Sequence, residues 1–127
     1  MTCTYFGALR SPEYEILGTI FTTEDPFSNE AWSDALVYNA TYIDPDLFWG
    51  EDGTVFLHSA GTLQQTIDLE SGEVTEPIEV WKGTGGAYSE GPHIYARDGW
   101  YYLLIGRGGT ELNHSATIAR ARIISGL

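Results

Sequence analysis

Cysteine, basic side chains and long apolar runs are scarce in this 127-residue chain. Cys3 is the single cysteine, so the chain can close no internal disulfide and has no cysteine pair with metal-binding spacing. No apolar run approaches the roughly 20 residues that cross a bilayer as a helix. The first residues lack the basic segment and apolar stretch of a signal peptide, and the localisation is left open.

The charge is strongly one-sided, with 6 Lys and Arg against 18 Asp and Glu and a formal net charge of −12. Such a surface repels the phosphates of nucleic acids and the anionic face of membranes, so we expect neither as a partner. Neutral ligands such as sugars remain compatible with it. The 4 Trp, 8 Tyr and 5 Phe could stack on sugar rings, although most aromatic residues of a β protein belong to its core.

Short segments rich in β-branched and aromatic residues dominate the chain, and turn residues separate them. Asp52-Gly53, Ser71-Gly72 and Asp98-Gly99 supply the positive φ angles that hairpin turns require. No segment has the periodicity of a packed helix, and residues 28–36 are expected to form one turn at most. The sequence therefore predicts an all-β fold, with strands at 15–23, 37–42, 54–60, 64–69, 78–81, 93–97, 100–106 and 116–121.

Two aromatic-rich hairpins, each with a carboxylate just ahead of it, look like copies of one unit. Asp44 precedes the hairpin at 47–57 and Glu90 precedes the hairpin at 93–103, so the acids lie 46 residues apart, as do the turn glycines Gly53 and Gly99. If the two units pack side by side, both carboxylates reach one site, and we expect them within about 10 Å of each other. Paired carboxylates on a rigid scaffold are the chemistry of glycoside hydrolysis.

The 46-residue repeat also favours one all-β architecture over the others. Repeats of about 40–50 residues, each worth four strands, are typical of β-propeller blades, whose innermost strands line a central channel. Sandwiches and barrels show no sequence repeat of that length. Since 127 residues hold slightly fewer than three such repeats and closed propellers have about 4–8 blades, the sequence predicts a propeller fragment of two to three blades.

The two acidic segments, their hairpins and the glycine-rich segments around them resemble glycoside hydrolase family 43. The family consists of five-bladed β-propeller enzymes that act as β-xylosidases, α-L-arabinofuranosidases and arabinanases. The resemblance runs in the family's order through residues 43–53, 83–86, 89–95, 99–104, 108–111 and 116–120. It implies that residues 1–127 are one partial propeller domain that acts on xylo- or arabino-oligosaccharides. The sequence does not decide between xylose and arabinose.

The resemblance also implies roles for the two acids. Glu90, in its Glu-Gly-Pro-His setting, corresponds to the proton donor of inverting hydrolysis. Asp44, in its Asp-Pro setting, corresponds to the residue that raises the pKa of that acid and orients the substrate. The family's aspartate base lies in its first blade, and no segment here matches it. The first and the C-terminal blades are thus expected to be missing, and the isolated chain to have little or no activity.

Other residues near the two acids carry weaker implications. His93 and Trp49 are the candidates for sugar contact, although a hydrogen-bonded structural role is the simpler interpretation of His93. Arg107 stands where the family commonly has an acidic or neutral residue, and its role is open. No organic cofactor is implied. Several members hold calcium through a histidine, but the spacing of the three histidines here supports no such ligand.

Two other functions stay open. The chain could be a non-catalytic or vestigial carbohydrate-binding piece that has lost its base. It could also be a structural propeller that mediates protein interactions, which would predict no specific affinity for sugars.

Overall fold

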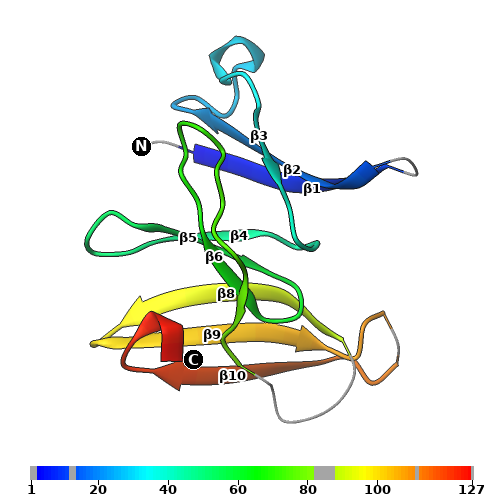
Figure 1. The fold of residues 1–127 in the computed structure, drawn as a ribbon, viewed down its shortest axis with the longest axis vertical. Coiled ribbons are helices and arrows are strands. Elements are labelled where there is room, and N and C mark those ends of the chain that lie inside the picture. Colours follow the sequence, from blue (N-terminus) through cyan, green and yellow to red (C-terminus); the bar gives the residue numbers. More distant parts are fainter. Residues whose placement is uncertain (1–2, 12–13, 82–87, 111, 127) are drawn as a thin grey trace.

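The computed structural model describes residues 3–11, 14–81, 88–110 and 112–126. Within these ranges the chain forms ten strands in three antiparallel sheets and no α-helix, which confirms the all-β prediction (Figure 1). The one turn expected within residues 28–36 is the 3₁₀ turn at Asn29–Ala31, and a second 3₁₀ turn lies at Ile124–Gly126. None of the described segments is a helix long and apolar enough to cross a membrane.

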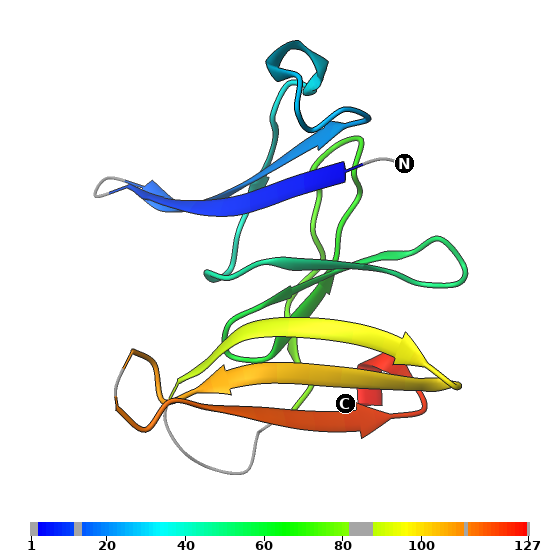
Figure 2. The same cartoon turned by 180° about the vertical axis from the view of Figure 1, so that it is seen from behind.

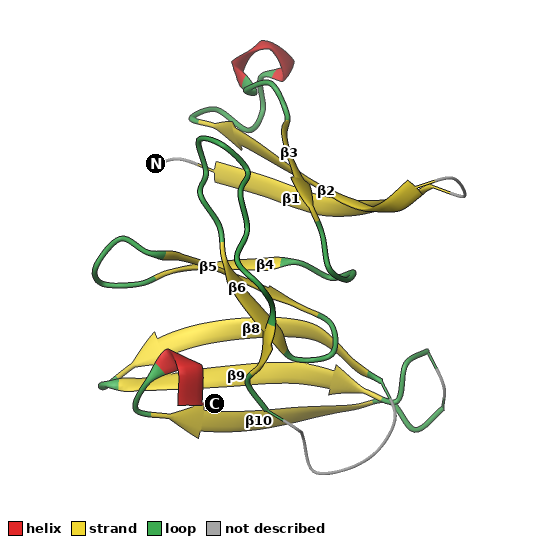
Figure 3. Ribbon diagram, viewed as in Figure 1, coloured by secondary structure: helices red, strands yellow, loops and turns green. Residues whose placement is uncertain are grey.

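The three sheets follow one another along the chain (Figure 3). The first has the order β1-β2-β3, with β1 at Cys3–Ser11, β2 at Tyr14–Thr23 and β3 at Leu36–Asn39. The second has the order β4-β5-β6-β7, with its strands at Asp46–Trp49, Val55–Ser59, Leu63–Thr66 and Ile78–Glu79. The third has the order β10-β9-β8, with β8 at Ser89–Arg97, β9 at Trp100–Arg107 and β10 at Ser115–Ala121.

The second sheet lies between the other two, as both views show (Figures 1 and 2). Its strands β4 and β5 contact β8, the first strand of the third sheet. The second and third sheets therefore meet along the chain segments that carry the two acidic motifs. This packing places residues 44–46 and 90–94 beside each other.

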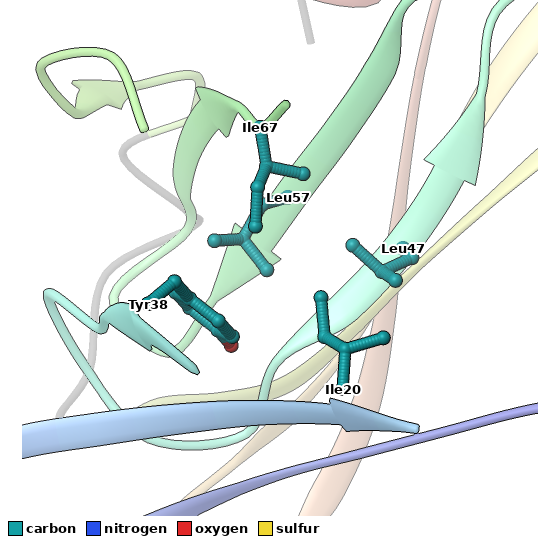
Figure 4. Packing of buried hydrophobic residues seen from close by; sticks show 5 residues of the cluster. All are labelled: Ile20, Tyr38, Leu47, Leu57 and Ile67. Atoms are coloured by element: carbon teal, nitrogen blue, oxygen red, sulfur yellow. The ribbon is translucent and has the colours of Figure 1, made fainter. Parts of the chain in front are cut away.

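Two apolar clusters hold the sheets together. The first joins sheets one and two through side chains that point toward one another in Figure 4: Ile20, Tyr38, Leu47, Leu57 and Ile67. The second cluster lies against the third sheet and consists of Val80, Ile94, Leu103 and Ile105. Leu103 and Ile105 are essentially without solvent contact, so the central strand β9 is the most deeply buried part of that sheet.

The hairpin turns follow from their sequences. Gly53, Gly72 and Gly99 all have positive φ angles, as the three turn motifs predict. Asp98 joins Gly99 in the left-handed region, so β8 and β9 are connected by a two-residue turn between the paired residues Arg97 and Trp100. The loop between β4 and β5 is longer, because their last pair is Trp49 and Val55.

This difference in loop length changes the repeat. Leu47 pairs with Leu57, and Ile94 pairs with Leu103 in the equivalent place. Leu103 follows Leu57 by 46 residues, but Ile94 follows Leu47 by 47. The offset predicted from the sequence thus holds for the second strand of each hairpin and is one residue longer in the first.

Two further differences from the predicted strands concern β1 and the start of β8. β1 was not predicted, and it pairs along most of its length with β2, from Cys3 with Thr23 to Ser11 with Tyr14. Its centre, Gly7-Ala8, has little intrinsic strand preference, so tertiary pairing decides its structure. β8 begins at Ser89 rather than at residue 93, and the strand therefore includes Glu90.

Candidate active site

Asp44 lies in the turn that leads into β4. Its backbone has a positive φ of 56°, which a short polar side chain tolerates better than most. The preceding carbonyl, that of Ile43, accepts a hydrogen bond from the backbone N–H of Ala60 at 3.0 Å, which ties the turn to the end of β5. The Asp44 side chain is exposed, and its Oδ2 accepts a hydrogen bond of 3.1 Å from the backbone N–H of Gly91.

Glu90 lies in β8 immediately before a β-bulge. Glu90 pairs with Gly106 and His93 pairs with Leu104, so Gly91 and Pro92 together face the single residue Ile105 of β9. A bulge accommodates a proline in a paired strand, because the missing N–H leaves no ladder bond unmade there. The side chain of Pro92 is buried, which anchors the bulge in the fold.

A cleft of about 330 Å³ lies beside Glu90. Glu90 is half-buried in its wall. The other residues that line the cleft are mostly aromatic or polar: Tyr42, Gly61, Thr62, Glu79, Trp81, Tyr88 and Ser89. The second sheet is tied to this wall by a 2.7 Å hydrogen bond from the backbone N–H of Gly61 to the carbonyl of Ser89. The cleft therefore offers two carboxyl groups, those of Glu79 and Glu90, with aromatic surfaces, which is a setting that suits a sugar.

The loop after β9 comes close to Glu90 and Tyr88. Gly108 and Gly109 both have positive φ angles, of 93° and 57°, and His114 Nδ1 donates a hydrogen bond to the carbonyl of Gly109. A Cβ placed on Gly109 would lie 3.9 Å from Glu90 Oε2 and 3.5 Å from the Tyr88 ring. These are ordinary van der Waals distances, so the positive φ of Gly109, rather than lack of space, favours glycine at this position.

Asp46 also lies at the contact between the Asp44 turn and β8, and the sequence analysis assigns it no role. Its Oδ1 accepts a hydrogen bond of 3.0 Å from His93 Nδ1, and its Oδ2 accepts one of 3.2 Å from the backbone N–H of Ile94. One signal could have found it. Asp46 follows Asp44 by two residues in the motif Ile-Asp-Pro-Asp and is the first residue of β4, directly after the turn that carries Asp44.

The structure brings together some of the residues singled out by the sequence. Asp44 contacts the residue directly after Glu90, as the packing of the two hairpins predicts. The structural interpretation of His93 agrees with its bond to Asp46, and its side chain is 52% exposed. Arg107 pairs with Ser89 in β8, next to the pair formed by Glu90 and Gly106. The catalytic roles themselves stay predictions.

Trp49 does not lie beside Asp44, Asp46 and Glu90. It is the last residue of β4, three residues beyond Asp46, and a strand rises about 3.3 Å per residue, so it stands roughly 10 Å further along. Its side chain is about half exposed at the end of the hairpin, where it pairs with Val55. Trp49 is close to the acids in the sequence but not in space, because β4 extends away from them.

One titratable group next to Asp46 has a pKa that the fold shifts. His58 lies opposite Asp46 in the β4–β5 pair and is buried, with 1% of its surface exposed. Burial lowers the pKa of His58, because the protonated ring would lose its hydration, while its hydrogen bond to Gln64 and the charge of Asp46 act in the other direction. Its Nε2 lies 3.0 Å from Gln64 Oε1, and Nδ1 has no partner among the described residues.

The described residues do not form a metal site. Among them, no group of three or more His, Cys, Asp or Glu side chains is placed to hold a metal ion. The calcium ion that the resemblance allows stays an expectation, and no residue of this chain is assigned to it.

The comparisons with known proteins agree on one family. Residues 16–126 match the pattern of the family described as Glycosyl hydrolases family 43. A xylosidase/arabinosidase 43B from Humicola insolens is 37% identical in an alignment of 108 positions that covers 75% of this chain and 20% of that protein. A β-xylosidase from Bacillus subtilis is 34% identical in an alignment of 111 positions that covers 77% of this chain and 21% of that protein.

A solved structure extends the match to the fold. The xylan β-1,4-xylosidase from Bacillus halodurans C-125 superposes with a TM-score of 0.81 at 28% identity, covering 98% of this chain and 26% of that one. The chain spans about a fifth to a quarter of the length of these relatives. With the family pattern matched over most of its residues, the chain belongs to glycosyl hydrolases family 43.

Proposed function

We propose that this chain supplies the proton donor and a companion carboxylate to a glycoside hydrolase that removes xylosyl or arabinofuranosyl units from hemicellulose. The observation that carries the proposal is the hydrogen bond from Gly91 N–H to Asp44, which joins the two acidic motifs beside the cleft that Glu90 lines. The names of the relatives, xylosidase/arabinosidase and β-xylosidase, support the substrate class.

The proposal includes an architecture larger than the chain. The three sheets are three successive blades of a five-bladed propeller, and residues 1–127 are one part of that domain. The contacts of β4 and β5 with β8 support this arrangement, because they bring the first strands of two sheets together as around a propeller axis. The general base that activates water then comes from outside the span, since no segment here matches the family's base motif.

In this mechanism Glu90, Asp44 and the aromatic residues of the cleft have different roles. The Glu90 carboxyl group donates its proton to the glycosidic oxygen as the bond from that oxygen to the anomeric carbon breaks. Water, deprotonated by the base, attacks the anomeric carbon from the opposite face and inverts its configuration. Asp44 tunes the acid and orients the sugar, and its bond to Gly91 fixes it beside Glu90. The aromatic residues of the cleft wall contact the sugar faces.

A chimera tests the proposal. The chain replaces the corresponding segment of the Bacillus halodurans xylosidase, and hydrolysis of xylosides and arabinofuranosides is measured for the parent chimera, Glu90→Gln and Glu79→Gln. Glu79 lines the same cleft and serves as the matched control. We expect Glu90→Gln to lose activity by about 10²–10⁴-fold and Glu79→Gln to lose far less. Equal activity of Glu90→Gln and the parent chimera would contradict the proposal.

A further inference from the structure

The Asp46 carboxylate joins the second and third sheets at one point. Both of its oxygens accept hydrogen bonds from β8, at 3.0 Å from His93 Nδ1 and at 3.2 Å from the backbone N–H of Ile94. The Asp46 side chain is only 13% exposed, while the His93 ring that it binds is 52% exposed. A largely buried carboxylate that binds a single strand through both oxygens restrains the position of that strand.

The restrained segment is the bulge that follows Glu90. Within the bulge, Gly91 and Pro92 face the single residue Ile105, so the ladder to β9 is interrupted. Asp44 accepts the bond from the N–H of Gly91 at the start of the bulge, and Asp46 accepts the bond from the N–H of Ile94 just past its end. Side chains of the neighbouring sheet thus hold both ends of the segment that carries Glu90.

We propose that Asp46 is a positioning residue for Glu90, acting through His93 and the β8 bulge. The inference rests on the proposed function, since it assumes that Glu90 is the proton donor. Without the Asp46 bonds, the end of the bulge loses its hydrogen bonds to the second sheet, while Asp44 and the bond from Gly61 N–H to the Ser89 carbonyl still hold its start. The bulge can then shift, and the Glu90 carboxyl group moves with it from its place in the cleft. A displacement of about 1 Å is enough to lower a rate by roughly 10²-fold.

The geometry also fixes the tautomer of His93. Because the Asp46 oxygen can only accept, the neutral ring carries its proton on Nδ1 and leaves Nε2 unprotonated. Asparagine at position 46 can keep both contacts in a different way. Its carbonyl oxygen accepts from Ile94 N–H while its amide N–H₂ donates to His93 Nδ1, which forces the ring into the Nε2–H tautomer. Alanine at position 46 can keep neither contact.

The test compares Asp46→Ala, Asp46→Asn and a matched control, Asp68→Ala. Asp68 Oδ1 also accepts two backbone hydrogen bonds, from Glu70 and Ser71 at 2.8 Å each, but in an exposed turn of the second sheet. Nitrogen-15 spectra of the histidine rings in residues 1–127 report the His93 tautomer. Kinetics of the chimera with poor and activated leaving groups report the placement of the acid.

We expect Asp46→Ala to lower kcat on poor leaving groups by roughly ten- to a hundredfold, with KM changed by less than about threefold. Asp46→Asn should recover most of that loss and switch the His93 tautomer, while Asp68→Ala changes neither kcat nor the tautomer. If Asp46→Ala prevents folding, His93→Leu, which has no donor for Asp46 and so removes one of the two bonds, should show a smaller loss of the same kind.

The results that would overturn the inference are distinct from failure of the proposed function. Equal losses for alanine and asparagine, equal losses on both leaving groups, or no loss in any variant would each show that Asp46 does not position the acid. A chimera in which Glu90→Gln stays fully active would instead remove the proposed function itself.

Discussion

At the scale of single residues, His58 couples the fold to pH. Its pKa is lowered by burial, so between that value and the ordinary value of 6.5 the unfolded chain binds a proton that the folded chain does not. The free energy of unfolding is therefore unaffected by His58 above about pH 6.5 and decreases as the pH falls below it. We expect the Tm to drop between pH 7.5 and pH 5.5, and to drop less in His58→Gln. An identical drop in both proteins would contradict this assignment.

Tyr38 is the second residue for which the structure makes a definite statement. Its ring is buried in the first apolar cluster, its hydroxyl has no hydrogen-bond partner among the described residues, and burial raises its pKa to about 12. A buried hydroxyl without a partner costs stability, because it has given up its bonds to water. We expect Tyr38→Phe to stabilise the chain by about 1 kcal/mol in urea unfolding. A loss of similar size would mean that the hydroxyl has a partner in solution.

At the scale of elements, β2 and β3 approach each other through a glycine. Gly18 pairs with Tyr38, and a Cβ at position 18 would overlap the Tyr38 ring. We expect Gly18→Ala to destabilise the chain by at least about 1–3 kcal/mol, because a well-packed core does not accept an added methyl group there. Thr19→Ala, one residue along the same strand, is the control and should cost less. Similar midpoints of urea unfolding for both variants would contradict the packing described here.

The elements also show where sequence reasoning succeeds and where it fails. The hairpin turns could be predicted, because Gly53 and Gly99 occupy positions that require a positive φ angle. β1 could not, because Gly7 and Ala8 at its centre have little strand preference and its structure depends on pairing with β2. Strand preference is local information, whereas pairing depends on residues that are distant along the chain.

The candidate site shows the same division. Asp44 and Glu90 were found because equal spacing along the sequence marks them as equivalent. Asp46 was missed because its place depends on the register. The longer loop between β4 and β5 shifts the first strands to an offset of 47 residues, which makes Asp46 the counterpart of His93, the residue it binds. Trp49 was an aromatic neighbour of the acids in sequence only.

At the scale of the whole molecule, the second and third sheets meet along the segments that carry the acids, and the chain spans about a fifth to a quarter of the length of its relatives. The proposed assignment places the base outside residues 1–127. We therefore expect the chain alone to show no turnover of aryl xylosides or arabinofuranosides that depends on Glu90. The assay compares the purified chain with its Glu90→Gln variant. Turnover lost in that variant would place a base within the chain.

The role of Glu90 as proton donor is the central claim, and the dependence of rate on the leaving group tests it most directly. A poor leaving group needs the proton as its bond breaks, whereas an activated aryl leaving group departs with little help. In the chimera, Glu90→Gln should lower kcat/KM by about 10²–10⁴-fold for an alkyl glycoside or oligosaccharide and far less for an activated aryl glycoside. Equal losses on the two substrates would contradict the assignment.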